Sequence, residues 1–419
     1  YRDVMVMYYF ENKTTAQIAK LQNASETAIR QRLFSARNSI RSEVKNMEEA
    51  KKPLVLDEIN FEIIGTGQPG WGDPRDVFQR QMSKHILLSC FKNAKTATEV
   101  SDELGIPMPY VEEELDILTK GANGEYGLLK KLTNGRYGIN FILFDKENID
   151  NLHNAYISSI PDFGSRIINY VENHREEILA LPYLNHKVDL NRILWANLNW
   201  LVAVIEDMVY DQLKTIHFKD MVEVTRPFSV FGYIDNGKYY GCGCDGIGAS
   251  NICGYAHVDI SNIYISKIKK HFSCGHDIGN DRQLQLAIEA INGIKVSDIK
   301  EEDKEQVAKA IEVGYLYIEG DMIYTKILVR EYGDEKEHTD VWVGMYKEVE
   351  SLASEIAAKI AGLVRANVPE YLWNEYRFAN HLAGIPLYDA ISDALIDKGY
   401  MTVPESGLGA EGCIMRVMK

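Results

Sequence analysis

The segment that most constrains the fold of this chain is residues 14–41, TTAQIAKLQNASETAIRQRLFSARNSIR. Ala19 is small enough to let a second helix cross a short first helix, and apolar residues recur on the inward side of both. Asn23 stands where the chain must turn sharply, and Asn tolerates the positive φ of such a turn better than most residues other than glycine. Ser25 is placed to cap the second helix. This pattern predicts a helix-turn-helix.

The second helix of this motif presents polar side chains on its outward side, close to its amino end. Side chains at that position of a recognition helix reach base edges in the major groove of DNA. The competing interpretation is a set of helices used only for packing or dimerisation. The sequence favours a DNA interface formed by Ser25, Glu26, Thr27, Arg30 and Gln31.

Residues 1–43, YRDVMVMYYFENKTTAQIAKLQNASETAIRQRLFSARNSIRSE, carry a more specific pattern. A helix ending in YYFEN is followed by IA, a turn and TAIRQRLFSARNSIR. This pattern resembles region 4 of bacterial RNA polymerase sigma factors of the sigma-70 family, of the extracytoplasmic-function type, and the resemblance covers residues 1–45. Region 4 reads the −35 promoter element, so the resemblance implies DNA and RNA polymerase as partners. It also implies base-contacting positions for Glu26, Thr27, Arg30 and Gln31, and positions nearer phosphates or polymerase for Arg32, Arg37 and Arg41.

The charge of the chain is unevenly distributed. Residues 1–52 hold ten Lys and Arg against six Asp and Glu, a net charge of +4, whereas the remainder has a net charge of −19. Contact with nucleic acid is therefore expected only from the amino-terminal module. The content of 46% hydrophobic and 26% charged residues is typical of a soluble globular protein, and excludes a disordered or collagen-like chain.

Membrane insertion and a disulfide framework are both disfavoured. The most apolar stretch, residues 190–213, is interrupted by charged and amide side chains, which indicates a buried helix. Six cysteines are too few for a disulfide framework, and no signal peptide is evident. We therefore expect a cytoplasmic protein with reduced thiols and no membrane association, and the resemblance to region 4 implies that it is bacterial.

Glycine and proline positions, together with helical periodicity, divide the chain into six parts and predict an α+β multidomain fold. A three-helix helix-turn-helix is followed by a linker and a winged-helix-like domain. A mixed body of helices and antiparallel strands comes next: a helical segment, an α/β domain that could sense a ligand, and a helical or winged carboxy-terminal segment. The expected boundaries are, in the same order, 1–52, 53–78, 79–145, 146–222, 223–345 and 346–419.

The winged-helix-like domain repeats the rhythm of a helix-turn-helix in TATEVSDELGIPMPYVEEELDILTKG. Its third helix carries carboxylates where a DNA-reading helix would carry arginine, and phosphates would repel them. We therefore expect this domain to pack or to contact protein rather than DNA. The carboxylates are Glu112, Glu113, Glu114 and Asp116.

Two weaker patterns lie between residues 241 and 276. The run GCGCDG at 241–246 satisfies GxGxxG, but the residues after it indicate strand and turn, whereas a dinucleotide site needs a helix there. Four cysteines could form a zinc site, although their spacing lacks paired C-x2-C knuckles. Packed free thiols are the preferred interpretation, and no cofactor is expected. The cysteines are Cys242, Cys244, Cys253 and Cys274, with His257 and His276 nearby.

These inferences favour a transcriptional regulator in which the helix-turn-helix binds promoter DNA and the acidic body senses a small-molecule effector or a protein. Because one chain has one recognition helix, we expect a homodimer or a polymerase-associated complex. Two alternatives stay open: an enzyme with its active site in residues 226–330, tethered to DNA by the same module, and a sigma- or anti-sigma-type protein-interaction factor. No hydrolase, metalloprotease or phosphate-loop motif is present, so no catalytic residue is assigned.

Overall fold

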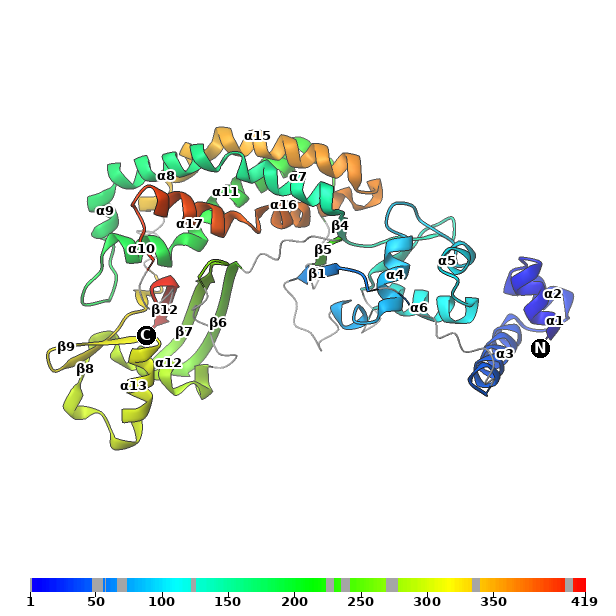
Figure 1. Ribbon diagram of the computed structural model, residues 1–419, viewed down its shortest axis with the longest axis horizontal. Coiled ribbons are helices and arrows are strands. Elements are labelled where there is room, and N and C mark those ends of the chain that lie inside the picture. The colour runs from blue at the N-terminus through cyan, green and yellow to red at the C-terminus, as the bar shows by residue number, and fades with distance from the viewer. Residues whose placement is uncertain are drawn as a thin grey trace. The chain divides into compact units, whose positions relative to one another are not determined.

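In the computed structural model the chain folds into two compact units (Figure 1). Unit 1 comprises residues 1–59 and 68–140, and unit 2 comprises residues 60–67 and 141–419. The structure describes residues 2–46, 56, 58–65, 74–121, 126–223, 230–234, 242–268, 278–333, 340–403 and 410–419.

Unit 1 begins with short helical elements whose starts are specified locally. Thr14 and Gln17 form a capping box: the Thr14 Oγ accepts the Gln17 N–H at 3.3 Å, and the Gln17 side chain accepts the Thr14 N–H at 2.9 Å. This arrangement satisfies two backbone donors that the first turn of a helix leaves unpaired. The elements are α1 (Arg2–Met5), a π-helical turn (Val6–Phe10), α2 (Thr15–Leu21) and α3 (Glu26–Asn46).

The turn between α2 and α3 has the geometry that the sequence predicts. Asn23 has a φ of +48°, and the Ser25 Oγ accepts the N–H of Ala28 at 3.1 Å. A small apolar core holds the helices together, which confirms the helix-turn-helix. Its buried members are Val4, Ile18, Ala19, Ile29 and Leu33.

Residues 81–140 of unit 1 are here called the second module. Thr96 and Glu99 form a capping box at the start of its middle helix, and Gly105, with a φ of +65°, ends that helix. Three helices followed by a two-stranded antiparallel hairpin is the order predicted for residues 79–145, and the winged-helix assignment stays a prediction. The elements are α4 (Gln81–Ser89), α5 (Ala97–Leu104), α6 (Met108–Lys120), β2 (Leu129–Lys131) and β3 (Tyr137–Ile139).

Unit 2 contains a small three-stranded sheet built from distant segments. β5 (Val230–Ile234) lies in the centre, antiparallel to β1 (Phe61–Gly65) and parallel to β4 (Ile142–Phe144). β1 falls inside residues 53–78, for which the glycines and prolines predict a linker. A five-residue strand is too short to give a clear periodicity of its own, and only pairing with β5 stabilises it.

A layer of helices forms the largest part of unit 2 (Figure 1). α11 packs against α15, α16 and α17, and α7 packs against α15 and α16. A stripe of apolar residues runs along α15, with Val349, Ile356 and Ile360 fully buried. The helices are α7 (Lys146–Ile157), α8 (Ile160–Asn173), α9 (Arg175–Leu179), α10 (Leu190–Ala196), α11 (Leu198–Gln212), α15 (Gly344–Asn367), α16 (Tyr376–Gly384) and α17 (Leu387–Asp397).

A four-stranded sheet closes the carboxy-terminal part of unit 2. Its order is β11 (Leu328–Glu331), β12 (Cys413–Met418), β7 (Tyr255–Tyr264) and β6 (Gly243–Ile252). β12 is parallel to β11 and antiparallel to β7, and β6 and β7 form a hairpin. Beside it lie α12 (Arg282–Glu289), α13 (Lys304–Glu312) and a second sheet of β8 (Ile294–Lys295), β10 (Met322–Thr325) and β9 (Leu316–Glu319).

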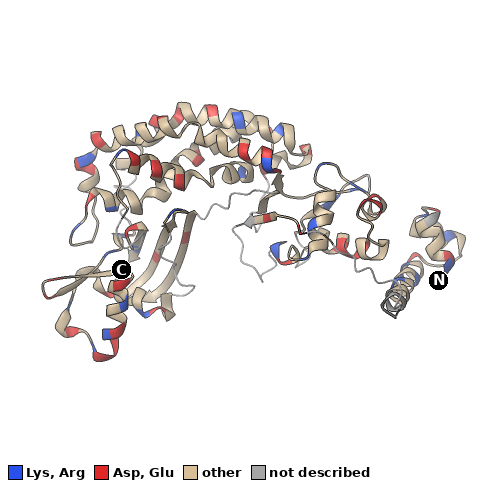
Figure 2. Cartoon of the chain, viewed as in Figure 1, with Lys and Arg blue, Asp and Glu red and all other residues tan. Residues whose placement is uncertain are grey.

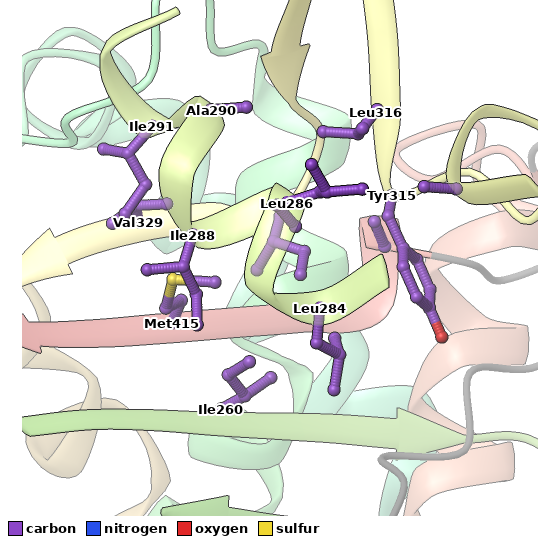
Figure 3. Packing of buried hydrophobic residues seen from close by; sticks show 14 of the residues in the cluster. Ile260, Leu284, Leu286, Ile288, Ala290, Ile291, Tyr315, Leu316, Val329 and Met415 are labelled. Carbon is purple, nitrogen blue, oxygen red and sulfur yellow. The ribbon is translucent and has the colours of Figure 1, made fainter. Parts of the chain in front are cut away.

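One face of the four-stranded sheet is covered by α12 (Figure 3). Leu284 and Ile288 point from α12 towards Ile260 of β7 and Met415 of β12, and all four side chains are buried. Full burial of an aliphatic side chain of this size stabilises the fold by about 1.5–3 kcal/mol. The hydrophobic core between α12 and the four-stranded sheet therefore depends on β12, the last strand in the sequence.

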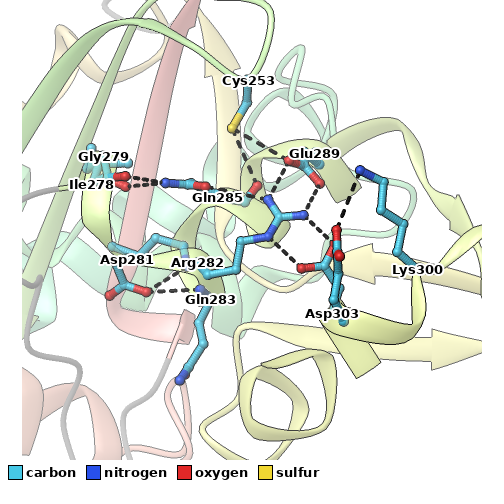
Figure 4. A network of polar contacts seen from close by, with 12 residues as sticks. Cys253, Ile278, Gly279, Asp281, Arg282, Gln283, Gln285, Glu289, Lys300 and Asp303 are labelled. Atoms are coloured by element: carbon cyan, nitrogen blue, oxygen red, sulfur yellow. Dashed lines mark hydrogen bonds and ion pairs between the residues drawn. The ribbon is translucent and has the colours of Figure 1, made fainter. Parts of the chain in front are cut away.

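The outer side of α12 is held by a polar network around Arg282 (Figure 4). Its guanidinium donates to both carboxylate oxygens of Asp303, at 2.8 and 2.7 Å, and to Glu289 at 2.7 Å. Hydrogen bonds to Asp303 and Glu289 raise the pKa of Arg282, so its guanidinium stays protonated. The network ties α12 to the turn that precedes α13.

The fold prediction is confirmed at the level of class: the chain is an α+β multidomain protein with an amino-terminal set of helices and a sheet-containing body. Among the described residues, no helix is both long enough and apolar enough to span a bilayer.

Candidate nucleic-acid interface

The amino-terminal half of α3 separates an inward apolar face from an outward polar one. Ile29 and Leu33 are buried in the core of the helix-turn-helix, whereas Thr27, Arg30 and Gln31 are exposed. Positions 27, 30, 31 and 34 lie on one side of an α-helix because 3.6 residues complete a turn. The predicted base-contacting side chains therefore share one open face.

Glu26 and Arg30 are paired on this face. Arg30 donates to the Glu26 carboxylate at 2.5 Å, and the Thr15 hydroxyl donates to the same oxygen at 2.8 Å. The hydrogen bond from Thr15, followed by that from Arg30, lowers the pKa of Glu26. Because the Arg30 side chain is 69% exposed, the pair is worth little in water, and the guanidinium can exchange Glu26 for a base.

Arg32 lies away from the exposed face. Its guanidinium donates to the Gln22 side chain at 2.9 Å, so it is directed back towards the turn between α2 and α3. Arg41 lies within α3, but its side chain is outside the described residues. The resemblance places Arg32, Arg37 and Arg41 nearer phosphates or polymerase. Arg32 contacts the turn before α3, and Arg37 contacts residues outside the helix-turn-helix.

Arg37 contacts the second module of unit 1. Its Nε donates to the Tyr9 hydroxyl at 2.8 Å, the Tyr9 hydroxyl donates to Glu112 of α6 at 2.6 Å, and Arg37 forms an ion pair with the same carboxylate. Burial, together with the hydrogen bond to Glu112, raises the pKa of Tyr9. The guanidinium also lies 6.0 Å from the ring centre of Tyr8. The guanidinium of Arg37 is thus bound by Tyr9 and Glu112 of the same chain.

The carboxylates of α6 do not form one exposed face. Glu113 and Asp116 are exposed, but Glu114 is only 1% exposed and accepts hydrogen bonds from Ser83 and, at 3.1 Å, from Arg80. Glu112 faces Arg37. Two of the four carboxylates, Glu112 and Glu114, thus contact residues of unit 1, in line with the expectation that this domain packs or contacts protein. Figure 2 shows acidic residues on both units, many of them on the helices of unit 2.

Phe34 is an exposed residue on the same face of α3 as Arg30, and the sequence reasoning did not select it. Its side chain is 62% exposed, four residues after Arg30 and seven after Thr27, and so on the same face of α3. Helical spacing in the sequence could have identified it, because a large apolar residue at an outward position is unusual. Phe is among the side chains that contact the methyl group of thymine.

The cysteines considered for zinc do not converge. Cys242 and Cys244 flank the start of β6, where the Cys242 thiol donates to the Ile385 carbonyl at 3.3 Å. Cys253 follows the other end of that ten-residue strand, about 30 Å away at the rise of an extended strand. Cys274 and His276 lie outside the described residues, and within the described ones no group of three or more His, Cys, Asp or Glu side chains could hold a metal ion.

The glycine-rich run leads into a strand. Gly241 is outside the described residues, and Gly243 begins β6, so no helix starts there to bind a pyrophosphate. Of the aromatic residues in the same region, Phe231 and Tyr233 are buried in the sheet that β5 forms. The strand that begins at Gly243 and the buried aromatic residues of β5 show that these parts of the region belong to sheets.

Residues 1–40 match the family model of sigma-70, region 4. The match spans α1, the π-helical turn, α2 and most of α3, and it confirms the region 4 helix-turn-helix predicted from the sequence. A region 4 segment is a DNA-binding element of transcription, and it implies interaction with DNA and RNA polymerase. No curated protein and no solved structure matches the chain.

Proposed function

We propose that this protein is a bacterial transcriptional regulator of the cytoplasm that binds promoter DNA through the amino-terminal half of α3. The observation that carries this proposal is the open face of α3, on which Thr27, Arg30 and Gln31 are exposed while the opposite face is held in a core. The region 4 match of residues 1–40 supports the same function and adds RNA polymerase as a partner.

Each side chain on this face has a role that its chemistry supports. Arg30 can donate two parallel hydrogen bonds to guanine, and Gln31 can bond adenine in the same bidentate manner. Phe34, one turn further along, offers an apolar contact to a thymine methyl group. Ser25 caps the amino end of α3, and Glu26 can accept a hydrogen bond from the amino group of cytosine.

A selection of DNA fragments by the full-length chain tests this function. Wild type should enrich one sequence motif, and a Thr27→Ala/Arg30→Ala/Gln31→Ala variant should lose it while retaining the fold. Arg175→Ala is the matched control, because Arg175 is an exposed arginine at the start of α9 in unit 2 and pairs with Glu172 near the end of α8. Enrichment of the same motif by the triple variant would refute recognition by α3.

The assembly and the role of the body belong to the same proposal. We propose a homodimer or a polymerase-bound complex, since a single α3 reads only one short site. The body, with its separate cores, would sense an effector or a protein. Analytical ultracentrifugation with and without promoter DNA distinguishes a dimer from a monomer that requires polymerase.

A second candidate function, a DNA-tethered enzyme, is favoured by three side chains on the hairpin of β6 and β7. The Ser250 hydroxyl lies 2.9 Å from Nδ1 of His257, and Nε2 of His257 lies 3.0 Å from the carboxylate of Asp259. Ser250 and His257 are cross-strand partners, and Asp259 lies two residues further on the same face. This is the order of nucleophile, base and orienting carboxylate.

Two further side chains contact Oδ2 of Asp259, whereas His257 contacts Oδ1. Arg416 of β12 lies 3.2 Å from Oδ2, and the hydroxyl of Tyr332 donates to the same oxygen. Gly248 lies opposite Asp259, and a Cβ at this position would come within 2.5 Å of its carboxylate. If His257 donates from Nε2, its Nδ1 can accept the proton of Ser250.

The chemistry expected of such a set is acyl transfer from an ester. The Ser250 oxygen would attack the carbonyl carbon, His257 would take the hydroxyl proton and pass it to the departing alcohol, and water would hydrolyse the acyl-serine. A fluorophosphonate probe should then label wild type, but not Ser250→Ala or His257→Ala. Ser261→Ala, on the same face of β7, is the control. Absence of labelling at Ser250 would refute the proposed enzymatic function.

A further inference from the structure

α11 and α16 of unit 2 enclose a cavity of about 230 Å³. Glu206, Asp207 and Tyr210 line it from α11, and Arg377 and His381 line it from α16. The described residues around it thus combine two carboxyl groups, a phenol, a guanidinium and an imidazole. Convergent polar groups in a concave site are a feature of ligand pockets, and most residues that line this one are polar.

Glu206 is the most deeply placed acid of this cavity. Its side chain is 19% exposed, and Gly384 provides its space, because a Cβ at position 384 would overlap the carboxylate. His381 lies 3.9 Å from it. Burial, with a smaller contribution from Asp207, raises the pKa of Glu206 to about 8. At neutral pH this residue is therefore a carboxylic acid that would ionise if a cation came close.

The other titratable groups around Glu206 do not supply that cation. Burial, together with Arg377, lowers the pKa of His381, which leaves its ring neutral. Arg377 shares its charge with Glu223, 3.6 Å away, and lies 5.7 Å from the ring centre of Tyr210. Burial also raises the pKa values of the remaining neutral groups near Glu206, which are Tyr156 of α7, Cys244 of β6 and Tyr388 of α17.

We propose that this cavity binds a small organic ammonium ion, with Glu206 as its carboxylate partner. Ammonium N–H groups would donate to Glu206 and Asp207, and the aromatic side chain of Tyr210 would contact the carbon chain. An anion is disfavoured because it would face two carboxyl groups, and the one guanidinium in the lining, that of Arg377, is already paired with Glu223. We expect the ion to be the effector that the body senses, and this role rests on the proposed function. Binding of the ion to the cavity does not depend on that function.

Proton release distinguishes this binding mode from binding of a neutral ligand in the same cavity. An ammonium ion stabilises the ionised form of Glu206, so binding at a pH below the pKa of Glu206 expels one proton. Affinity should therefore increase with pH, by up to tenfold for each unit, until the pKa of about 8 is reached. A neutral ligand of the same shape would leave the proton in place.

The experiment is a calorimetric titration of the full-length chain, without DNA, using n-butylammonium as the probe and n-butanol as its neutral isostere. Titrations at pH 6.5 and 8.5, in buffers of different ionisation enthalpy, measure both affinity and protons released. We expect tighter binding of n-butylammonium at pH 8.5, release of close to one proton at pH 6.5, and no such dependence for n-butanol. Equal binding of the two probes, or no binding of n-butylammonium, would overturn the proposal.

Variants assign the effect to Glu206. Glu206→Gln should weaken n-butylammonium binding at least tenfold at pH 8.5 and abolish proton release. Glu350→Gln, an exposed change on α15, should alter neither. Unchanged binding by Glu206→Gln would overturn the assignment. The comparison of the two probes on wild type does not depend on the folding of any variant. DNA binding is measured separately, so failure of the cavity would leave the DNA function standing.

Discussion

Arg37 of α3 and Glu112 of α6 form an ion pair that joins the helix-turn-helix to the second module of unit 1. The Tyr9 hydroxyl completes this contact, since it accepts from Arg37 and donates to Glu112. The side chains of Arg37 and Glu112 are 23% and 17% exposed, so water screens the pair less than a surface salt bridge. A residue that the resemblance places near phosphates is therefore held by the protein itself.

This contact predicts that Arg37→Ala acts on the structure of unit 1. Loss of the guanidinium would leave the half-buried Glu112 without its cation, which should destabilise the junction by about 1–3 kcal/mol. A double-mutant cycle with Glu112→Gln, followed by hydrogen exchange of α6, measures the coupling. The slope of DNA affinity against salt should stay unchanged. A slope reduced by about one would instead support the phosphate contact that the resemblance implies.

Arg30→Ala should relax the sequence preference of DNA binding. An arginine that bonds guanine discriminates against other bases by about 1–3 kcal/mol, and Arg30 can leave Glu26 at little cost because the pair is exposed. Binding to matched and mismatched sites measures the change, with Arg175→Ala as control. A variant that kept the wild-type preference at every position would show that Arg30 does not read bases.

The four carboxylates of α6 should respond differently to substitution. Glu113→Gln removes an exposed charge and should leave DNA affinity within a few-fold of wild type. Glu114→Gln removes a buried acceptor of Ser83 and Arg80, and should destabilise the second module by about 1–3 kcal/mol. Thermal unfolding and DNA titration of both variants separate these effects. A large loss of DNA binding by Glu113→Gln would place α6 in the interface.

The stability of unit 2 should decrease as pH rises. The pKa of Glu206 is about 8 in the folded chain against an ordinary 4.5, so the folded state binds the extra proton between these values and loses stability with increasing pH. Glu206→Gln should therefore gain stability relative to wild type, by a few kcal/mol above pH 8.

Denaturation followed by tryptophan fluorescence can test this, because four of the five tryptophans, Trp195, Trp200, Trp342 and Trp373, belong to unit 2. The difference between Glu206→Gln and wild type should widen from pH 5 to pH 9. A difference that is the same at every pH would show that Glu206 ionises as freely in the folded chain as in the unfolded one.

Local chemistry by itself determined the helix-turn-helix. Asn23 adopts positive φ, Ser25 caps α3, and Ile29 and Leu33 face inward, because each of these properties depends on a residue and its near neighbours in the chain. The open face of α3 follows from the same helical periodicity, so the sequence was sufficient to select Arg30 and Gln31.

Contacts between distant segments were decided only by the tertiary structure. β12 inserts between β11 and β7, although Met415 and its partner Ile260 are far apart in the chain. Arg37 meets Glu112, and Glu206 meets His381, in the same way. A charged side chain has the same local sequence signature whether it faces water, DNA or a buried partner. Its environment depends on which surfaces the folded chain brings together, and that depends on packing over the whole unit.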